Sequence, residues 1–156
     1  PLYYNGMFVA RSSGGENGTG GRVKAYDADS GNVIWTFYTV PAPGEFGHDT
    51  WPQDNEAWRH GGATVWQTPA VDPELGLIYF TTGNPGPDFN GRIRAGNNLF
   101  STSMVALDAR TGKYRWHFQQ IHHDLWDYDS PSPVVLFDVR VDGRLRKSSA
   151  EAKQAG

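Results

Sequence analysis

Three segments of this chain repeat one spacing, and that spacing restricts the possible folds more than any other feature. In each segment a glycine lies six residues after an alanine, and an aromatic residue lies ten residues after it. The segments are Ala25–Trp35, Ala70–Phe80 and Ala106–Trp116. Their starts are roughly 40 residues apart, a period that is typical of propeller blades and other repeat architectures.

Each repeat is interpreted as a β-hairpin. An Ala-x-Asp strand end enters a turn in which Asp, Ser or Thr bonds the local backbone and glycine takes a positive φ. The following strand then carries the aromatic residue inward, and these strands are expected at Val33–Tyr38, Leu77–Thr81 and Tyr114–Gln120. The predicted fold is all-β, a propeller with one blade per repeat and about three blades. Only residues 149–154 have any helical character, and they lack an apolar face.

Composition excludes several function classes. Fourteen Lys and Arg residues against 17 Asp and Glu residues give a net charge of −3, which is no footprint for nucleic acid or an anionic membrane surface. No apolar run approaches the length of a membrane span. The absence of cysteine removes disulfide and thiolate chemistry.

Polar chemistry is concentrated in a short segment, His122–Asp129, which holds three carboxylates, two imidazoles and two aromatic rings. Aspartate is depleted in strands, and Pro131 and Pro133 stop further ladder pairing. The segment is therefore expected to be a loop after the strand Tyr114–Gln120, where binding groups commonly concentrate. The alternative is a solvated acidic turn capped by aromatic residues.

Oxygen donors are expected at the ends of three separate strands. Glu16, Asn84 and Asp127 have the ligand chemistry that suits a hard cation such as calcium. Each also has an ordinary alternative, because Glu16 could be solvated and Asn84 could shape a turn. His122 and His123 would suit zinc, but adjacent residues of an extended segment point opposite ways and no further partner has suitable spacing.

Two glycine-containing segments are candidates for ligand contact. Residues 12–21 are glycine-rich but lack the Gly-Lys-Ser/Thr ending of a phosphate loop, and a strand is expected to follow them. Residues 61–66 place small residues before Trp66, so that a flat ligand could approach the backbone and stack on the indole. Trp66 as an ordinary core residue is the alternative.

From about Asn5 to Gly143 the chain resembles the pyrroloquinoline-quinone (PQQ)-dependent alcohol dehydrogenases, the quinoprotein propellers. The repeats look like that family's tryptophan-docking repeats, and four further motifs occur in the family's order. The resemblance implies cofactor contacts from Ser13, Gly14, Gly15, Thr64 and Trp66, metal ligation by Glu16 and Asn84, and a catalytic base at Asp127. Asp127 would also adjoin the metal.

The resemblance implies that residues 1–156 are part of an eight-bladed propeller, open at both ends. The intact protein would oxidise an alcohol or sugar hydroxyl by hydride transfer to a metal-polarised quinone. Electrons would pass to a cytochrome c or a membrane quinone, and the family is periplasmic, in some cases membrane-associated. His122–Asp127 also resembles the glucose-type dehydrogenases, whereas Thr82–Pro85 with Asn97–Phe100 resembles the alcohol type. The family's adjacent-cysteine disulfide and its basic quinone contact lie outside this chain.

Asp129 is a further candidate metal ligand. In an extended Asp127–Asp129 both carboxylates leave the same face, so Asp129 would reach the metal that Asp127 adjoins. In alcohol-type members an aspartate at this position resembles the mark of enzymes that use a lanthanide in place of calcium. Glucose-type relatives carry it without that implication.

Two rival functions belong to other classes. One is a non-catalytic propeller scaffold of the outer-membrane assembly type, which does not need Glu16, Trp66, Asn84 and Asp127 together. The other is a sugar-binding module that uses Trp51, Trp58 and Trp126 as stacking platforms. For either enzyme type, this chain alone is expected to lack turnover, because about three blades leave open strand edges.

Overall fold

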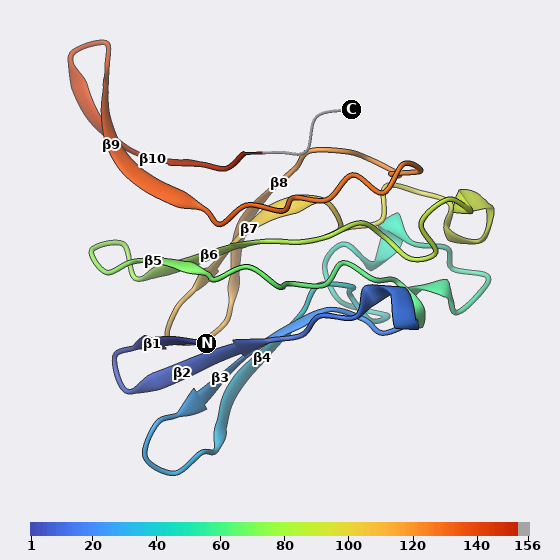
Figure 1. Ribbon diagram of the computed structural model, residues 1–156, viewed down its shortest axis with the longest axis horizontal. Helices are drawn as coiled ribbons and strands as arrows, with labels where there is room; N and C mark the ends of the chain where they lie inside the picture. The colour runs from blue at the N-terminus through green and yellow to red at the C-terminus, as the bar shows by residue number, and fades with distance from the viewer. Residues whose placement is uncertain (153–156) are drawn as a thin grey trace.

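The computed structural model describes residues 1–152 and contains two four-stranded antiparallel sheets and one hairpin (Figure 1). The first sheet has the order β1–β2–β3–β4, with the bounds Leu2–Tyr4, Met7–Arg11, Arg22–Asp27 and Val33–Tyr38. The second sheet has the order β5–β6–β7–β8, with the bounds Ala70–Asp72, Leu77–Thr81, Ser103–Asp108 and Tyr114–Gln119. The hairpin pairs β9, Val135–Val141, with β10, Arg144–Ala150.

The predicted hairpins form through the expected turn chemistry. Asp27 Oδ1 accepts hydrogen bonds from the Asp29 and Ser30 backbone and from the Ser30 hydroxyl, and Asp108 makes the same set of bonds in its own turn. Gly31 and Gly112 adopt φ values of 73° and 69°. The side-chain hydrogen bonds of these turns lower the pKa of both carboxyls. The Ala-x-Asp pattern thus specifies a local structure that does not depend on the rest of the fold.

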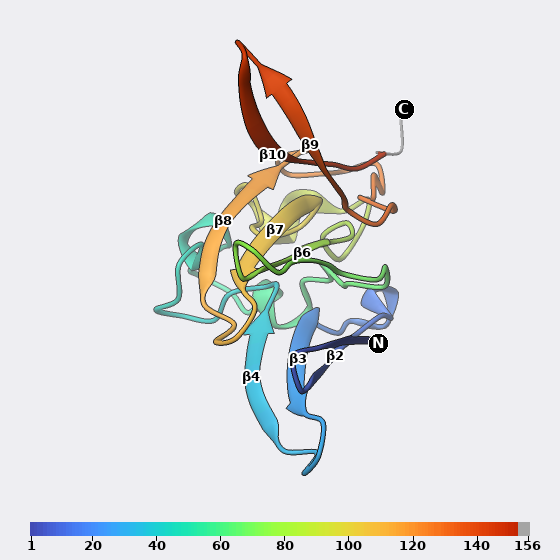
Figure 2. The same ribbon diagram turned by 90° about the vertical axis from the view of Figure 1, so that its left-hand side faces the viewer.

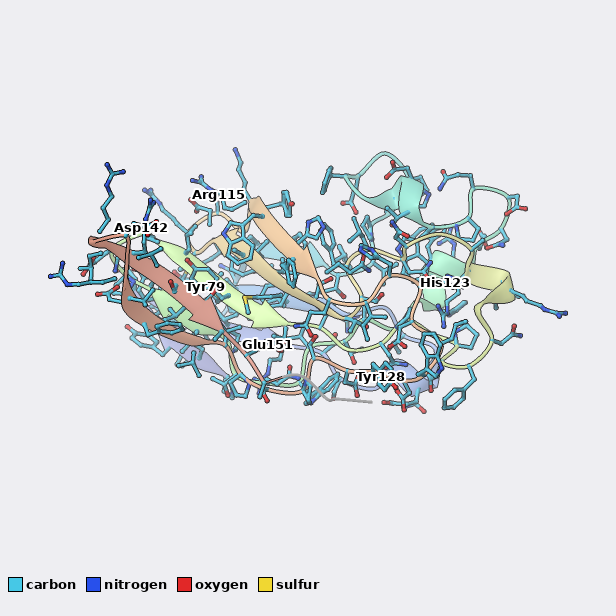
Figure 3. The ribbon with its side chains drawn as sticks, turned by 90° about the horizontal axis from the view of Figure 1, so that it is seen from above. Tyr79, Arg115, His123, Tyr128, Asp142 and Glu151 are labelled. Atoms are coloured by element: carbon cyan, nitrogen blue, oxygen red, sulfur yellow. The ribbon has the colours of Figure 1, made fainter. Side chains whose placement is uncertain are left out.

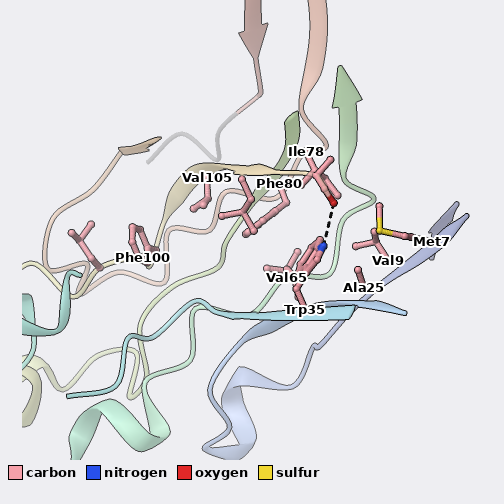
Figure 4. Packing of buried hydrophobic residues seen from close by; sticks show 13 residues of the cluster. Met7, Val9, Ala25, Trp35, Val65, Ile78, Phe80, Phe100 and Val105 are labelled. Atoms are coloured by element: carbon pink, nitrogen blue, oxygen red, sulfur yellow. Dashed lines mark hydrogen bonds between the residues drawn. The ribbon is translucent and has the colours of Figure 1, made fainter. Parts of the chain in front are cut away.

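One hydrophobic core lies between the two sheets, and Trp35 joins them (Figure 4). Its indole Nε1 donates to the Ala109 carbonyl oxygen at 3.1 Å, and the ring covers Gly112 of the second sheet's last turn. A β-carbon at Gly112 would collide with this ring, so only glycine allows the contact. The tryptophan of the first repeat therefore docks on the turn of the third repeat.

The prediction of one blade per repeat is wrong. The second repeat forms β5–β6 and the third forms β7–β8, and both belong to the same sheet. A hairpin repeat therefore corresponds to half of a four-stranded blade. Figure 2 shows the two sheets as successive layers, with β9 and β10 projecting beyond the second.

The end of the chain also differs from expectation. Ser149 and Ala150 finish strand β10 rather than a helix, and residues 153 and 154 lie outside the described range. Within residues 1–152, no helix has the length and apolar character needed to cross a membrane.

The remaining structure consists of long loops with single 3₁₀ turns: η1, Gly15–Asn17; η2, His48–Thr50; η3, Ala57–His60; and η4, Gly91–Arg94. These loops collect at one end of the sheets, opposite the β9–β10 turn. In Figure 3, His123 and Tyr128 lie at the loop end and Asp142 lies at the tip of the hairpin. The predicted functional loops therefore share one end of the fold.

Candidate functional site

The segment 61–66 runs along the junction of the two sheets and joins the predicted ligand loops by backbone pairing. On one side Gly62 pairs with Gly20, and the Val65 amide donates to the Ser12 carbonyl oxygen at 2.9 Å. On the other side Gly62 pairs with Pro85, and the Ala63 amide donates to the Asn84 carbonyl oxygen at 2.8 Å. Backbone hydrogen bonds thus hold the loop with Glu16 and the loop with Asn84 on either side of this segment.

The glycine-rich loop of the first sheet lies against Thr64. Gly14 and Gly18, at φ values of 89° and 69°, flank the short turn η1 that carries Glu16. Gly15 approaches the Thr64 side chain so closely that a β-carbon would be 3.4 Å from it. The structure therefore places Gly15 against Thr64, with Glu16 next to it in the chain, and it leaves the side chains of Ser13 and Glu16 exposed.

Trp66 and Asp129 approach one another across Gly83. A β-carbon at Gly83 would collide with the Trp66 ring and would be 2.9 Å from an Asp129 oxygen. The same Asp129 oxygen, Oδ1, accepts a hydrogen bond from the backbone amide of Asn84 at 3.0 Å. Trp66 is half-buried, so its ring is neither a fully enclosed core residue nor a free surface residue.

Asp124 shapes the loop after β8. Its carboxylate is fully buried and accepts the Trp126 amide at 2.9 Å and the Tyr128 amide at 2.7 Å. Asp127 itself has φ 62°, a left-handed conformation. The extended Asp127–Asp129 conformation expected from the sequence is therefore wrong, although Asp129 does reach the neighbourhood of Asn84 and Trp66.

The carboxylates of this end of the fold repel one another. Burial raises the pKa of Asp129 to about 6, and the charges of Asp127, Asp124 and Glu16 contribute to the increase. Desolvation likewise raises the pKa of Asp127, together with the charges of Asp88, Asp124 and Glu16. A bound cation would relieve this repulsion, because an opposite charge favours the ionised carboxylates.

The donor chemistry fits a hard cation. The Asn84 side-chain nitrogen donates to Asp88 Oδ1 at 2.6 Å, which directs the amide oxygen away from Asp88 and leaves it available as a ligand. Glu16, Asp127 and Asp129 would add carboxylate oxygens. Within residues 1–152, no three His, Asp or Glu side chains lie close enough together to hold an ion, so Glu16, Asp127 and Asp129 do not form a ligand cluster by themselves.

The two histidines of the segment engage different partners. His122 Nδ1 bonds Gln119 Oε1 at 2.8 Å, and His123 Nδ1 bonds the Gly96 carbonyl oxygen at 2.9 Å. Of the three stacking platforms in the sugar-binding alternative, Trp51 is 1% exposed and therefore offers no ring face to a ligand. The alternative that requires Trp51 as a platform is therefore wrong.

Three residues near the site were not predicted from the sequence. They are Asp88, Arg94 and Asp124, the last as a residue that holds the loop of Asp127 in shape. Asp88 orients the Asn84 amide, and Asp124 holds the loop of Asp127. Asp88 follows Pro87 in a proline- and glycine-rich stretch, and no motif of the sequence sets it apart. The roles of the nine predicted site residues remain predictions, although the structure gathers them at one end of the fold.

Comparison with known proteins identifies relatives over the whole chain. Residues 1–156 match the PQQ family described as glucose/ethanol/alcohol dehydrogenase, beta-propeller domain. The chain is 36% identical to the quinoprotein alcohol dehydrogenase PedH of Pseudomonas putida, covering 100% of this chain and 28% of PedH. It is 38% identical to the quinohemoprotein alcohol dehydrogenase ADH-IIG of the same species, covering 100% of this chain and 23% of that protein.

Solved structures give the same result. The chain superimposes on the quinohemoprotein alcohol dehydrogenase ADHIIG of Pseudomonas putida HK5 with a TM-score of 0.89 and 38% identity, covering 98% of this chain and 24% of that one. It also superimposes on a europium-containing methanol dehydrogenase with a TM-score of 0.88 and 34% identity, covering 98% and 29%. The chain thus spans about a quarter of the length of the proteins it matches.

Proposed function

The chain belongs to the glucose/ethanol/alcohol dehydrogenase β-propeller family of PQQ proteins, and from this membership we propose that it supplies the metal- and quinone-binding end of a PQQ-dependent alcohol oxidoreductase. One observation carries the proposal: backbone pairing along residues 61–66 brings the segments of Glu16, Asn84 and Trp66 to one junction. At this junction the Asp129 carboxylate accepts a hydrogen bond from the backbone amide of Asn84. A propeller without a cofactor has no need of this arrangement, which disfavours the scaffold alternative.

Each residue has a role in this proposal. Glu16, Asn84 and Asp129 would hold a calcium or lanthanide ion, with Asp127 adjoining it. Trp66 would provide the face on which a flat ring lies, while Ser13, Gly14, Gly15 and Thr64 would contact the ring's edge. PQQ, when bound with its cation, supplies a polarised quinone that accepts hydride.

Asp127 would accept the proton of the substrate hydroxyl. Its exposed position allows contact with a substrate. Its raised pKa makes it a stronger proton acceptor than an ordinary aspartate once it is ionised. Asp124 would hold the loop of Asp127 through its two backbone bonds.

The substrate is proposed to be an alcohol, because the similar proteins are named alcohol and methanol dehydrogenases. A polyol or a sugar hydroxyl is the second candidate, because His122–Asp127 and Asp129 also resemble the glucose type. We further propose a cytochrome c or a membrane quinone as electron acceptor, and a periplasmic location. This chain alone is proposed to be inactive, because apolar side chains of both sheets, including Phe8 and Phe118, are exposed to solvent.

The test is reconstitution of the protein at its natural length. The metal-free protein would be loaded with PQQ and with calcium or lanthanum, and alcohol-dependent reduction of an artificial dye acceptor would be measured. We expect turnover only with both PQQ and cation, and a loss of about 10²–10⁴-fold in kcat for Asp127→Asn with PQQ binding retained. Near-normal turnover of the Asn variant would show that Asp127 is not the base.

A further inference from the structure

Arg94 is a guanidinium with no solvent exposure, in a turn whose other arginine is exposed. It ends η4, and Arg92 lies two residues before it on the outside of the same turn. Burying a cation is costly unless it is fully hydrogen-bonded. The environment of Arg94 must therefore repay this cost.

Its planar guanidinium makes four hydrogen bonds. Nε donates to the Pro87 carbonyl oxygen at 2.9 Å, and Nη2 donates to the carbonyl oxygens of Asp88 at 2.7 Å and Asp124 at 2.5 Å. Nη1 donates to Asn98 Oδ1 at 3.1 Å. The side chain thus joins three segments: two lie in its own loop, at Pro87–Asp88 and at Asn98, and the third, at Asp124, lies 30 residues further along the chain.

Two of these segments carry the proposed ligands. The Asp88 carboxylate accepts a hydrogen bond from the side-chain amide of Asn84 at 2.6 Å, and the Asp88 carbonyl oxygen accepts one from Arg94. Asp124 starts the loop of Asp127, and its carboxylate fixes the Trp126 and Tyr128 amides. One guanidinium therefore sets the separation between the backbone around Asn84 and the backbone around Asp127.

We propose that Arg94 is a positioning residue for the cation site, acting through Asp88 on Asn84 and through Asp124 on the loop of Asp127 and Asp129. The inference rests on the proposed function of this site. The positioning role requires the several donors of the planar guanidinium, because a lysine ammonium is a point charge that cannot span the same acceptors. Groups that orient metal ligands typically contribute 10–100-fold to metal affinity.

The experiment uses the PQQ-loaded, metal-free protein at its natural length and titrates terbium(III) as the probe. Terbium emission gives the affinity, and emission lifetimes in H₂O and D₂O count the water molecules bound to the ion. The variants are Arg94→Met, which keeps much of the apolar volume, and Arg94→Lys, which also keeps the charge. Arg92→Met is the matched control, because it removes an exposed arginine from the same turn.

We expect both Arg94 variants to bind terbium about 10–100-fold more weakly, with more water on the ion, while Arg92→Met equals the wild type. If Arg94→Met does not fold by near-ultraviolet circular dichroism, Arg94→Lys decides the question. Wild-type affinity and hydration in Arg94→Lys would overturn the proposal, since the charge alone would then suffice. A wild type that binds no terbium would instead reject the proposed function, and the positioning role with it.

Discussion

Cation binding at this site is expected to release a proton from Asp129, by an amount that pH determines. Burial raises the pKa of this carboxyl to about 6, the Asn84 amide opposes the increase, and the charges of Asp127, Asp124 and Glu16 add to it. A raised pKa means that the metal-free site holds a proton below pH 6 and loses it above. A cation requires the ionised form, so the two compete.

The size of the effect follows from the pKa. With half of the carboxyls protonated at pH 6, binding releases about 0.9 proton from Asp129 at pH 5, about 0.5 at pH 6 and about 0.1 at pH 7. The same competition weakens the apparent affinity roughly tenfold for each pH unit below 6 and has little effect above pH 7.

The assay is calorimetric titration of lanthanum into the metal-free, PQQ-loaded protein in buffers of different ionisation enthalpy, which gives the proton count directly. Asp129→Asn retains an oxygen for the Asn84 amide and removes the titrating proton. Release in this variant should fall by about half a proton at pH 6. Asp142→Asn, in the distant hairpin turn, is the control. Equal proton counts for wild type and Asp129→Asn at pH 6 would refute the reasoning.

Three further outcomes are expected. Trp35→Phe removes the bond to the Ala109 carbonyl and should lower the free energy of unfolding by about 1–3 kcal/mol in urea titrations, whereas Trp126→Phe, at an exposed site, should change it little. Gly62 has a φ of 67°, and an alanine there would place a methyl group 2.8 Å from the Asn84 carbonyl oxygen. Gly62→Ala should therefore lower the free energy of unfolding by about 1–3 kcal/mol. The same variant should bind lanthanum more weakly in calorimetric titration. Asp129→Ala should remove any preference for lanthanum over calcium in dye-reduction rates while sparing calcium activity; unchanged preference would exclude Asp129 as its source.

The parts of the fold that sequence predicted well are those fixed by local chemistry. The strands Val33–Tyr38 and Leu77–Thr81 have the predicted bounds, because Asx turns and glycines at positive φ specify each hairpin on its own. The assignment of hairpins to sheets depends on strand pairing between distant segments, which the repeat spacing does not encode. The turn Asp142-Gly143 was an available hairpin signal for β9–β10, but the polar composition of Arg144–Ala150 concealed it.

The candidate site divides in the same way. Glu16, Asn84 and Trp66 were predicted from motifs, and the structure brings their segments together. The left-handed backbone of Asp127 was not predictable, because it results from the Asp124 carboxylate bonding two amides further along the loop. Arg94 was not predictable either, since an arginine in a glycine- and asparagine-rich stretch looks solvent-exposed until its four acceptors are known.

The junction along residues 61–66 makes the two sheets and the ion thermodynamically interdependent. Glu16 comes from a loop of the first sheet, and Asn84 comes from a loop of the second. A cation bound by both would resist sliding of one sheet past the other. By reciprocity, if the ion stabilises the packing of the two sheets against one another, separating the sheets weakens the ion's affinity by the same free energy that the ion adds to their packing. Affinity for the ion is therefore a sensitive gauge of how well distant parts of the propeller fit together.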